Sequence, residues 1–145
     1  MIKTFRGLLA DGDQNRIRLS TKNGKTGYKI ITLNIMPNTP MDGNEQQAVV
    51  KIFKIKQTVI TDDVDYSDGN LLATAIVRQT ADQVYLQTVM FEQEIFNQDI
   101  YITFEDQGAS GKAMNYYLEL EVMPLSDNAA VVSTLRDIRL NPEPI

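Results

Sequence analysis

The densest group of side chains that could do chemistry is the acidic stretch Asp62-Asp63-Val64-Asp65-Tyr66-Ser67-Asp68-Gly69. Alternating Asp and Ser oxygens in a loop can coordinate Ca²⁺, and Asp63, Asp65 and Asp68 are the candidate ligands. The EF-hand pattern fails, because the sixth position counted from Asp63 is Asp68 rather than Gly and the twelfth is Thr74 rather than Glu. The alternative is a solvated acidic turn, which we favour, and we therefore expect no metal or other cofactor.

A second set of carboxylates, Glu92, Glu94 and Asp99, could supply the acid and base of glycoside hydrolysis. Glu92 and Glu94 share a face if their segment is a strand, so nothing gives them the different environments that acid and base roles require. The chain has no His and no Cys, which removes the commonest general base and any thiolate nucleophile. It also has no phosphate-cradling glycine motif. We interpret these carboxylates as surface charge and predict that the protein is not an enzyme.

Five further residues are candidates for binding or for an interface. Tyr101 and Tyr117 are predicted on the polar side of their strands, where they could stack on a sugar or contact a neighbouring strand or subunit. The absence of Trp weakens the sugar interpretation. Lys51, Lys54 and Lys56 lie along one strand-like segment and would discourage edge-to-edge pairing if that strand lies at an edge.

The elements that must position these residues are apolar runs of strand length separated by turn signals. In residues 28–36, Ile31, Leu33 and Ile35 are predicted on one face, and Tyr116 falls on the apolar face of the last run. The runs are residues 2–9, 16–20, 28–36, 49–56, 71–78, 84–91, 99–105 and 114–122. Such spacing predicts an all-β fold, an antiparallel β-sandwich of the jelly-roll type.

The period of the pattern changes after Pro124. Val131, Leu135 and Ile138 recur on one helical face, and either Ser126 or Asp127 could cap the helix. We therefore expect a short C-terminal helix followed by an extended tail. The predicted organisation is a β-sandwich over residues 1–125, with the helix and tail, residues 126–145, packed on the same domain.

The charge of the chain argues against some partners and leaves one question open. The net charge is −5 and the isoelectric point about 4.7, so nucleic acid is not an expected direct partner. No apolar run is long enough to span a membrane or to form a signal peptide, which predicts synthesis in the cytoplasm. Residues 1–56 carry +6 and residues 57–145 carry −11. Interleaved strands could mix these charges in space; alternatively, the subunit is dipolar and meets copies of itself or another protein surface through opposite charges.

Three stretches carry a resemblance to a known group of proteins. They read FRGLLADG at 5–12 with RIRL at 16–19 and GYKI at 27–30, EIFNQDIY at 94–101, and NYYLELE at 115–121 with MPLSD at 123–127. Together they resemble small proteins encoded by tailed bacteriophages of marine bacteria. The resemblance spans most of the chain, and it implies a virion-associated β protein that decorates or cements the head.

The sequence therefore predicts a non-enzymatic structural protein of the virion, a capsid decoration or cement protein that stabilises the head by subunit contacts. Its expected partners are copies of itself, for which a trimer is one arrangement, and the major capsid protein. The alternative is a β-sandwich module of a fibre or tail that binds carbohydrate or a host surface.

Overall fold

A computed structural model describes residues 1–42, 44–80, 83–91, 94–107 and 111–140. Its elements follow the predicted runs closely, so the all-β fold with one C-terminal helix is confirmed. They are β1 (Ile2–Leu9), β2 (Gln14–Ile17), β3 (Thr26–Pro37), β4 (Gln46–Phe53), β5 (Leu71–Gln79), β6 (Val84–Met90), β7 (Ile100–Asp106), β8 (Met114–Pro124) and α1 (Asp127–Leu140).

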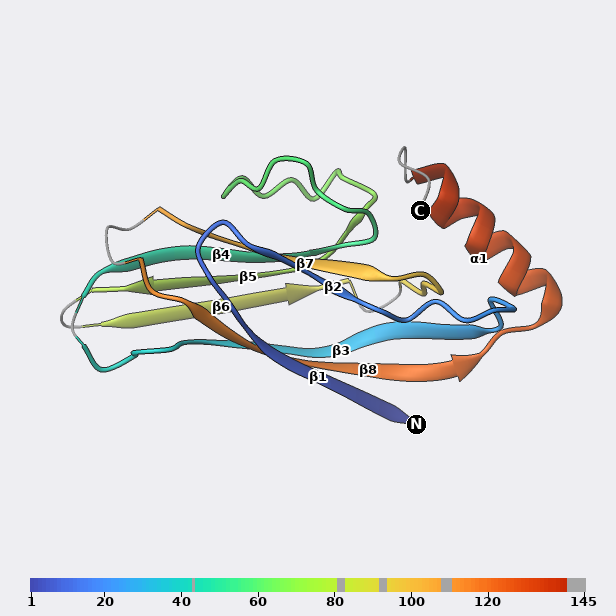
Figure 1. The fold of residues 1–145 in the computed structure, drawn as a ribbon, viewed down its shortest axis with the longest axis horizontal. Coiled ribbons are helices and arrows are strands. Elements are labelled where there is room, and N and C mark those ends of the chain that lie inside the picture. Colours follow the sequence, from blue (N-terminus) through green and yellow to red (C-terminus); the bar gives the residue numbers. More distant parts are fainter. Residues whose placement is uncertain (43, 81–82, 92–93, 108–110, 141–145) are drawn as a thin grey trace.

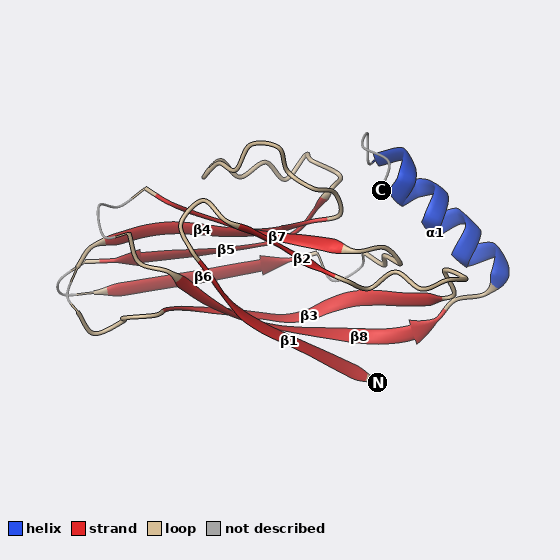
Figure 2. Ribbon diagram, in the orientation of Figure 1, coloured by secondary structure: helices blue, strands red, loops and turns tan. Residues whose placement is uncertain are grey.

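The strands form two antiparallel sheets that pack as a sandwich (Figures 1 and 2). One sheet has three strands in the order β1-β8-β3, and the other has five in the order β2-β7-β4-β5-β6. Side chains that are fully buried come from both sheets, among them Leu9 and Leu118 from the first and Ile102 and Phe104 from the second. The hydrophobic core therefore lies between the two layers, as alternating strands require.

The jelly-roll arrangement is not confirmed, because of one strand. A jelly roll pairs strand 1 with 8, 2 with 7, 3 with 6 and 4 with 5. Here β1 pairs with β8, β2 with β7 and β4 with β5, but β6 is hydrogen-bonded to β5. It comes close to β3 without joining its sheet. The three-stranded sheet therefore ends at β3, and β6 lies at the end of the five-stranded sheet.

Alternation sorts the side chains of β8 as predicted, but a bulge changes the pattern in β3. Tyr116 is buried and Tyr117 is 37% exposed, since successive residues point to opposite faces. In β3 the register against β8 shifts between Ile30 and Thr32. The prediction that Ile31 shares the buried face of Leu33 was therefore wrong: Ile30 is buried there and Ile31 is only half-buried.

The outer face of β4 and β7 in the five-stranded sheet is covered by the segment between β4 and β5, which loops above these strands in Figure 1. Lys51 on β4 donates hydrogen bonds from Nζ to the carbonyl oxygen of Asp63 (2.7 Å) and to Oγ1 of Thr61 (3.3 Å). Tyr101 and Thr103 on β7 are also buried. Both faces of the two central strands are therefore protected from water.

Helix α1 begins as predicted but presents a different face to the domain. Ser126 is its N-cap, because Oγ accepts a hydrogen bond from the N–H of Ala129 (3.1 Å). Asn97 donates from Nδ2 to Oγ1 of Thr134 (2.7 Å), and Ala130 is buried. Val131 and Leu135, which the sequence places on one helical face, are exposed. This apolar stripe is not the packing face of the helix, because the hydrogen bonds of Asn97 hold the side with Ala130 and Thr134 against the domain. The tail at 141–145 lies outside the described residues.

Candidate functional site

Lys51 and Lys54, predicted as interface or edge residues, are buried. They lie on and just after β4, which is a central strand with β7 and β5 on either side, so they do not protect an edge. Burial lowers the pKa of Lys51, and Asp63 offsets part of that effect. Nζ of Lys54 lies 3.1 Å from Oε2 of Glu94. Lys56 is exposed and keeps its place as a contact candidate.

The acidic stretch forms turns that use the carboxylates one at a time. Asp65 accepts from the N–H of Ser67 (2.9 Å) through Oδ1, and Asp68 accepts from the N–H of Asn70 (2.9 Å) in the same way. The hydrogen bonds from the hydroxyl and the backbone of Ser67 lower the pKa of Asp65. Asp63 contributes its backbone oxygen to Lys51. In the described part of the chain, no three acidic side chains gather in a way that could hold a metal ion.

The described residues contain no catalytic pair formed by the carboxylates considered for hydrolysis. Glu92 lies outside the described residues, and Glu94 pairs with Lys54. Asp99 is buried and accepts hydrogen bonds from the backbone N–H groups of Leu19 (2.6 Å) and Ser20 (2.8 Å) and from Nε of Arg16 (2.6 Å). Burial alone would raise the pKa of Asp99, but these hydrogen bonds outweigh it and the pKa is lowered. Asp99 therefore fastens the chain after β2 to the start of β7.

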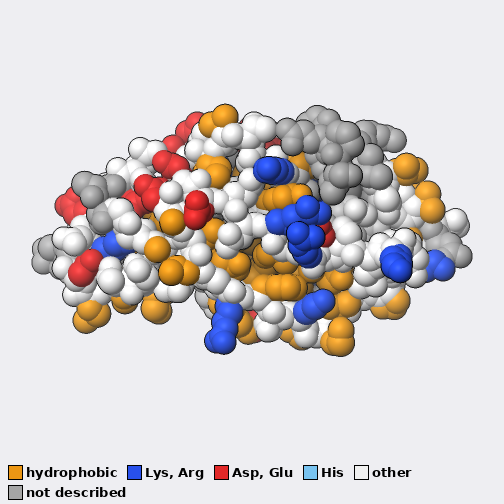
Figure 3. Space-filling model, in the orientation of Figure 1, with side chains coloured by type: hydrophobic (Ala, Val, Ile, Leu, Met, Phe, Trp, Pro, Cys, Tyr) orange, Lys and Arg blue, Asp and Glu red, His pale blue; other side chains and the backbone are white. Residues whose placement is uncertain are grey.

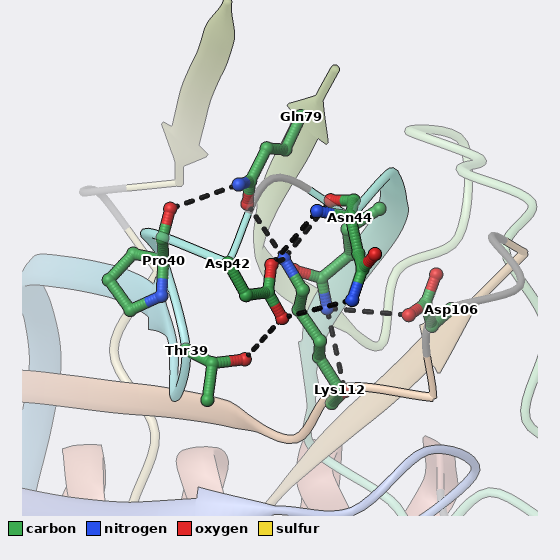
Figure 4. Close-up of polar contacts among 8 residues, drawn as sticks. Thr39, Pro40, Asp42, Asn44, Gln79, Asp106 and Lys112 are labelled. Carbon is green, nitrogen blue, oxygen red and sulfur yellow. Dashed lines mark hydrogen bonds and ion pairs between the residues drawn. The ribbon is translucent and has the colours of Figure 1, made fainter. Parts of the chain in front are cut away.

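A buried cluster around Lys112 was not anticipated from the sequence (Figure 4). Nζ of Lys112 lies 2.6 Å from Oδ1 of Asp42 and donates to the carbonyl oxygen of Asn44 (3.1 Å) and to Oε1 of Gln79 (3.3 Å). The hydrogen bond from Lys112 lowers the pKa of Asp42 to about 2. The cluster ties together the β3–β4 loop, the end of β5 and the segment before β8. No local pattern marks it, since its members come from three distant parts of the chain.

The buried amide of Gln46 extends this cluster. Its Nε2 donates to Oδ2 of Asp106 and to the carbonyl oxygen of Lys112, each at 3.4 Å, while its Oε1 has no hydrogen-bond partner among the described residues. Gln79 adds a bond from Nε2 to the carbonyl oxygen of Pro40 (3.0 Å). Such side-chain bridges to loop backbone hold connections in place at this end of the sandwich.

Of the two tyrosines predicted on polar faces, only Tyr117 is exposed. Tyr101 lies under the segment between β4 and β5 and is 6% exposed, so its expected surface position was wrong. Tyr116 packs beneath β1 opposite Gly7, where a Cβ would lie 2.7 Å from its Oη. Only glycine leaves room for that ring. Oη of Tyr117 donates to Oε1 of Glu119 (2.6 Å), which raises the pKa of Tyr117 and holds its ring over the outer face of the three-stranded sheet.

Tyr117 lies in a patch that we call the Tyr117 face. It comprises the outer-face residues Arg6, Leu8, Asn34, Met36, Asn115 and Tyr117. The strand register places them in two rows across the sheet, Leu8-Asn115-Met36 and Arg6-Tyr117-Asn34. A shallow groove of about 570 Å³ runs among them.

The composition of the Tyr117 face suits contact with another molecule. Leu8 is 52% exposed and Met36 is 58% exposed, and exposed apolar groups rimmed by polar ones mark interaction sites. Tyr and Arg are the residue types that most often anchor interfaces. The amides of Asn34 and Asn115 add donors and acceptors. The face can therefore combine an aromatic surface, apolar contacts and directional hydrogen bonds.

Charged side chains are partly separated on the view in Figure 3. Most acidic side chains visible there gather toward the left of the molecule, and most basic ones lie across the middle and the right. Side chains of opposite charge are therefore not fully mixed on this face. Such a distribution can orient a subunit against an oppositely charged neighbour.

Comparison with known proteins gives no relative: no family model matches the chain, and no curated protein matches its sequence. Among the described residues, none of the helical segments combines the length and the apolar character that a membrane crossing needs.

Proposed function

We propose that this protein is a non-enzymatic structural component of a phage particle, a decoration or cement protein that binds the head through surface contacts. The observation that carries the proposal is the Tyr117 face, where Leu8, Met36 and Tyr117 are exposed together on a rigid sheet. Exposed apolar area of this kind is stabilised when a partner covers it. The resemblance of three stretches of the chain to phage proteins supplies the identity of the particle.

The way in which the buried charged side chains are paired supports a structural role for the protein. Lys51, Lys54 and Lys112 each bind an internal carboxylate or carbonyl oxygen, and Asp99 binds Arg16 and two backbone N–H groups. Buried charges that are paired and hydrogen-bonded hold a fold in one arrangement. A rigid subunit is what a cement protein requires, because its binding energy is not spent on ordering loops.

The proposed partners are the major capsid protein and further copies of this chain, and the proposed location is the virion. The partial separation of acidic and basic side chains in Figure 3 supports contacts between unlike charges at such interfaces. Lys56, which is exposed, is a candidate for the rim of these contacts.

One observation favours a second function, binding of carbohydrate or a host surface by a fibre or tail module. Tyr117 presents an aromatic ring. Asn34 lies opposite it on β3, Asn115 lies two residues before it on β8, and both have amide groups suited to sugar hydroxyls. Arg6 adds a cation to the same groove. In this case the Tyr117 face would bind a glycan in place of a capsid surface.

Mass spectrometry of purified particles tests the first function. We expect the protein in a fixed stoichiometry with the major capsid protein; its absence from particles would overturn the proposal. Purified protein should also rebind particles stripped of it, and Tyr117→Ala should weaken rebinding about tenfold or more, because anchors of this type dominate interfaces. The matched control is Ile2→Ala, an exposed apolar residue at the other end of β1, opposite Glu121, which should rebind normally.

A glycan array decides between the two functions. Binding of the wild type to a defined glycan, lost in both Tyr117→Ala and Asn34→Ala, would favour the module interpretation. Rebinding to stripped heads without any glycan binding would favour the cement interpretation.

A further inference from the structure

The strand β6 lies at one edge of the five-stranded sheet, close to β3 but not hydrogen-bonded to it. Among the described strands it is hydrogen-bonded to β5 alone. Its sequence, VYLQTVM at 84–90, contains no charged residue, no Pro and no Gly. Val84, Tyr85 and Leu86 are 55%, 54% and 53% exposed. A long, apolar, uncharged edge strand is the kind that pairs with another strand.

The open hydrogen-bonding groups of β6 can be assigned from its register. Thr80 donates to the carbonyl oxygen of Gln83 (2.8 Å) at one end of the pair with β5, and Phe91 donates to that of Leu72 (3.0 Å) at the other. The register between them is regular, and antiparallel residues alternate between bonded and non-bonded pairs. The odd-numbered residues of β6 therefore bond to β5. The N–H and C=O groups that point to the open edge belong to Val84, Leu86, Thr88 and Met90.

The three other edge strands each carry a feature that blocks pairing. β1 carries Lys3 and Arg6, and β2 is only four residues long and includes Arg16. β3 carries Lys29 and the bulge after Ile30. Charges, short length and bulges are the usual protections of exposed edges. β6 has none of them, which singles it out as the edge that accepts a partner.

The inner side chains at the start of β6 lack a cover as well, whereas Met90 at its end packs against the core. Val84, Leu86, Thr88 and Met90 lie opposite Gln79, Val77, Ala75 and Ala73, of which the last three belong to the core. The inner face continues along β6, but among the described strands the three-stranded sheet ends at β3. Leu86 and Val84 therefore stay half exposed on a face that is buried elsewhere. An added strand would shield them.

We propose that β6 pairs antiparallel with β6 of a second copy of this chain, about a twofold axis at Gln87. In this register the edge-facing residues Val84 and Leu86 meet Met90 and Thr88 of the partner strand, so every open N–H and C=O finds a partner. Tyr85 meets Val89 on the outer side, an aromatic and β-branched combination that stabilises sheets. The two five-stranded sheets become one continuous sheet.

The second copy is favoured as the occupant because the strand is complementary to itself. A strand that meets β6 must bring an apolar, uncharged sequence, and a copy of β6 brings one by symmetry. The overlap in this register is complete, from Val84 to Met90. Self-pairing concerns the isolated chain and does not rest on the phage role proposed above.

The oligomeric state across a concentration series tests the proposal, measured by size-exclusion chromatography with light scattering. The wild type should be dimeric. Gln87→Lys and Gln87→Glu each place like charges opposite one another at the axis and should weaken the dimer about fivefold or more. Gln87 is exposed and its backbone faces β5, so either variant should fold normally, which circular dichroism checks.

The oligomeric state of a mixture of the two charged variants is the decisive measurement. Lys at position 87 of one copy then faces Glu at position 87 of the other, which should restore pairing as a heterodimer. The matched control is Thr21→Lys, which adds the same charge at an exposed position after β2, the strand at the opposite edge of the sheet, and should remain dimeric. A second variant, Thr88→Pro, removes an edge-facing N–H that β5 does not use and should abolish pairing.

Three results would overturn the proposal: a wild type that is monomeric at every concentration, an oligomer with an odd number of subunits, or charged variants that dimerise alone as well as the wild type. Tyr117→Ala should leave the dimer intact. Failure of the dimer test would therefore leave the particle-binding test unaffected.

Discussion

The outer faces of the two sheets differ in their exposure to water, although side chains alternate between the two faces of each strand in a similar way. On the five-stranded sheet, Tyr101 and Lys51 point outward and are buried beneath the segment between β4 and β5. On the three-stranded sheet, Tyr117 and Leu8 point outward and remain exposed. Outward position in a strand therefore does not define a surface; a covering segment turns one outer face into a second interior layer.

The difference separates stability from recognition. The covered face is held by a buried ammonium, by hydrogen bonds to loop backbone and by the edge-on contact of Tyr66 with Phe91, whose ring centroids lie 5.3 Å apart. The open face is held by its strand ladders, by the core behind it and by exposed side-chain contacts such as that of Tyr117 with Glu119. Substitutions on the first should change the free energy of unfolding, and substitutions on the second should change binding.

Tyr101→Ala and Tyr117→Ala should show the largest difference in stability between the two faces. Loss of the buried ring should cost about 3–5 kcal/mol of unfolding free energy, because it leaves a cavity. Loss of the exposed ring should cost about 1 kcal/mol or less. Denaturant unfolding of both variants measures the contrast. Equal destabilisation would mean that the segment between β4 and β5 does not cover the sheet.

Asp99→Asn should have the next largest effect on the unfolding free energy, and this effect should depend on pH. Asn cannot accept the charge-assisted bonds from Arg16 and Leu19, so about 2–3 kcal/mol should be lost at neutral pH. The pKa of Asp99 in the folded state is lower than its ordinary value in the unfolded chain. The stabilisation is therefore fully present above the unfolded-state pKa and is lost as the pH falls through the folded-state pKa.

The matched control for Asp99 lies on the open sheet. Lys29 and Glu121 form an ion pair at 3.3 Å, but both side chains are more than a third exposed. Glu121→Gln should therefore change the unfolding free energy by less than about 1 kcal/mol. The free energy of chemical unfolding should fall between neutral and acidic pH with a slope that Asp99→Asn reduces and Glu121→Gln leaves unchanged. A slope unchanged in Asp99→Asn would contradict the assignment.

Lys51→Met tests how the covering segment is fastened. The substitution keeps most of the buried stem but leaves the carbonyl oxygen of Asp63 and Oγ1 of Thr61 without their donor. We expect a loss of about 1–3 kcal/mol, with faster amide hydrogen exchange confined to residues 58–68. Lys56→Met, at an exposed position nearby, should leave exchange unchanged. Slow exchange in Lys51→Met would show that other contacts hold the segment.

The smallest effect is expected for Leu8→Ala on the open face. Leu8 is 52% exposed, so its truncation should change stability by about 0.5 kcal/mol or less. Ile35→Ala, a buried position on the same sheet, should cost about 2–5 kcal/mol. Thermal unfolding checks both. A large loss in Leu8→Ala would indicate that the Tyr117 face is already covered within the subunit.

Much of the fold was predictable because it depends on local patterns. The strand runs, the helix after Pro124 and its Ser126 cap all follow from alternation, turn residues and capping chemistry within a few neighbouring positions. The side of Tyr117 on β8 followed from the same alternation. The shift at Ile31 could not be foreseen, since a bulge is decided by how β3 meets β8.

The candidate site was only partly predictable, for the same reason. Tyr117 was found, but Tyr101, Lys51 and Lys54 were misplaced because an outward residue becomes buried only if a distant segment covers it. The cluster around Lys112 was missed because its partners are far apart in the chain.

The sequence by itself therefore determined where strands form, which side of each strand is apolar, and where the helix starts, because neighbouring residues decide these matters. Tertiary structure alone decided which strands are central, which outer face is covered, which lysines lose contact with water and which edge stays open. These outcomes depend on pairings between segments far apart in the chain, and local patterns carry no information about them.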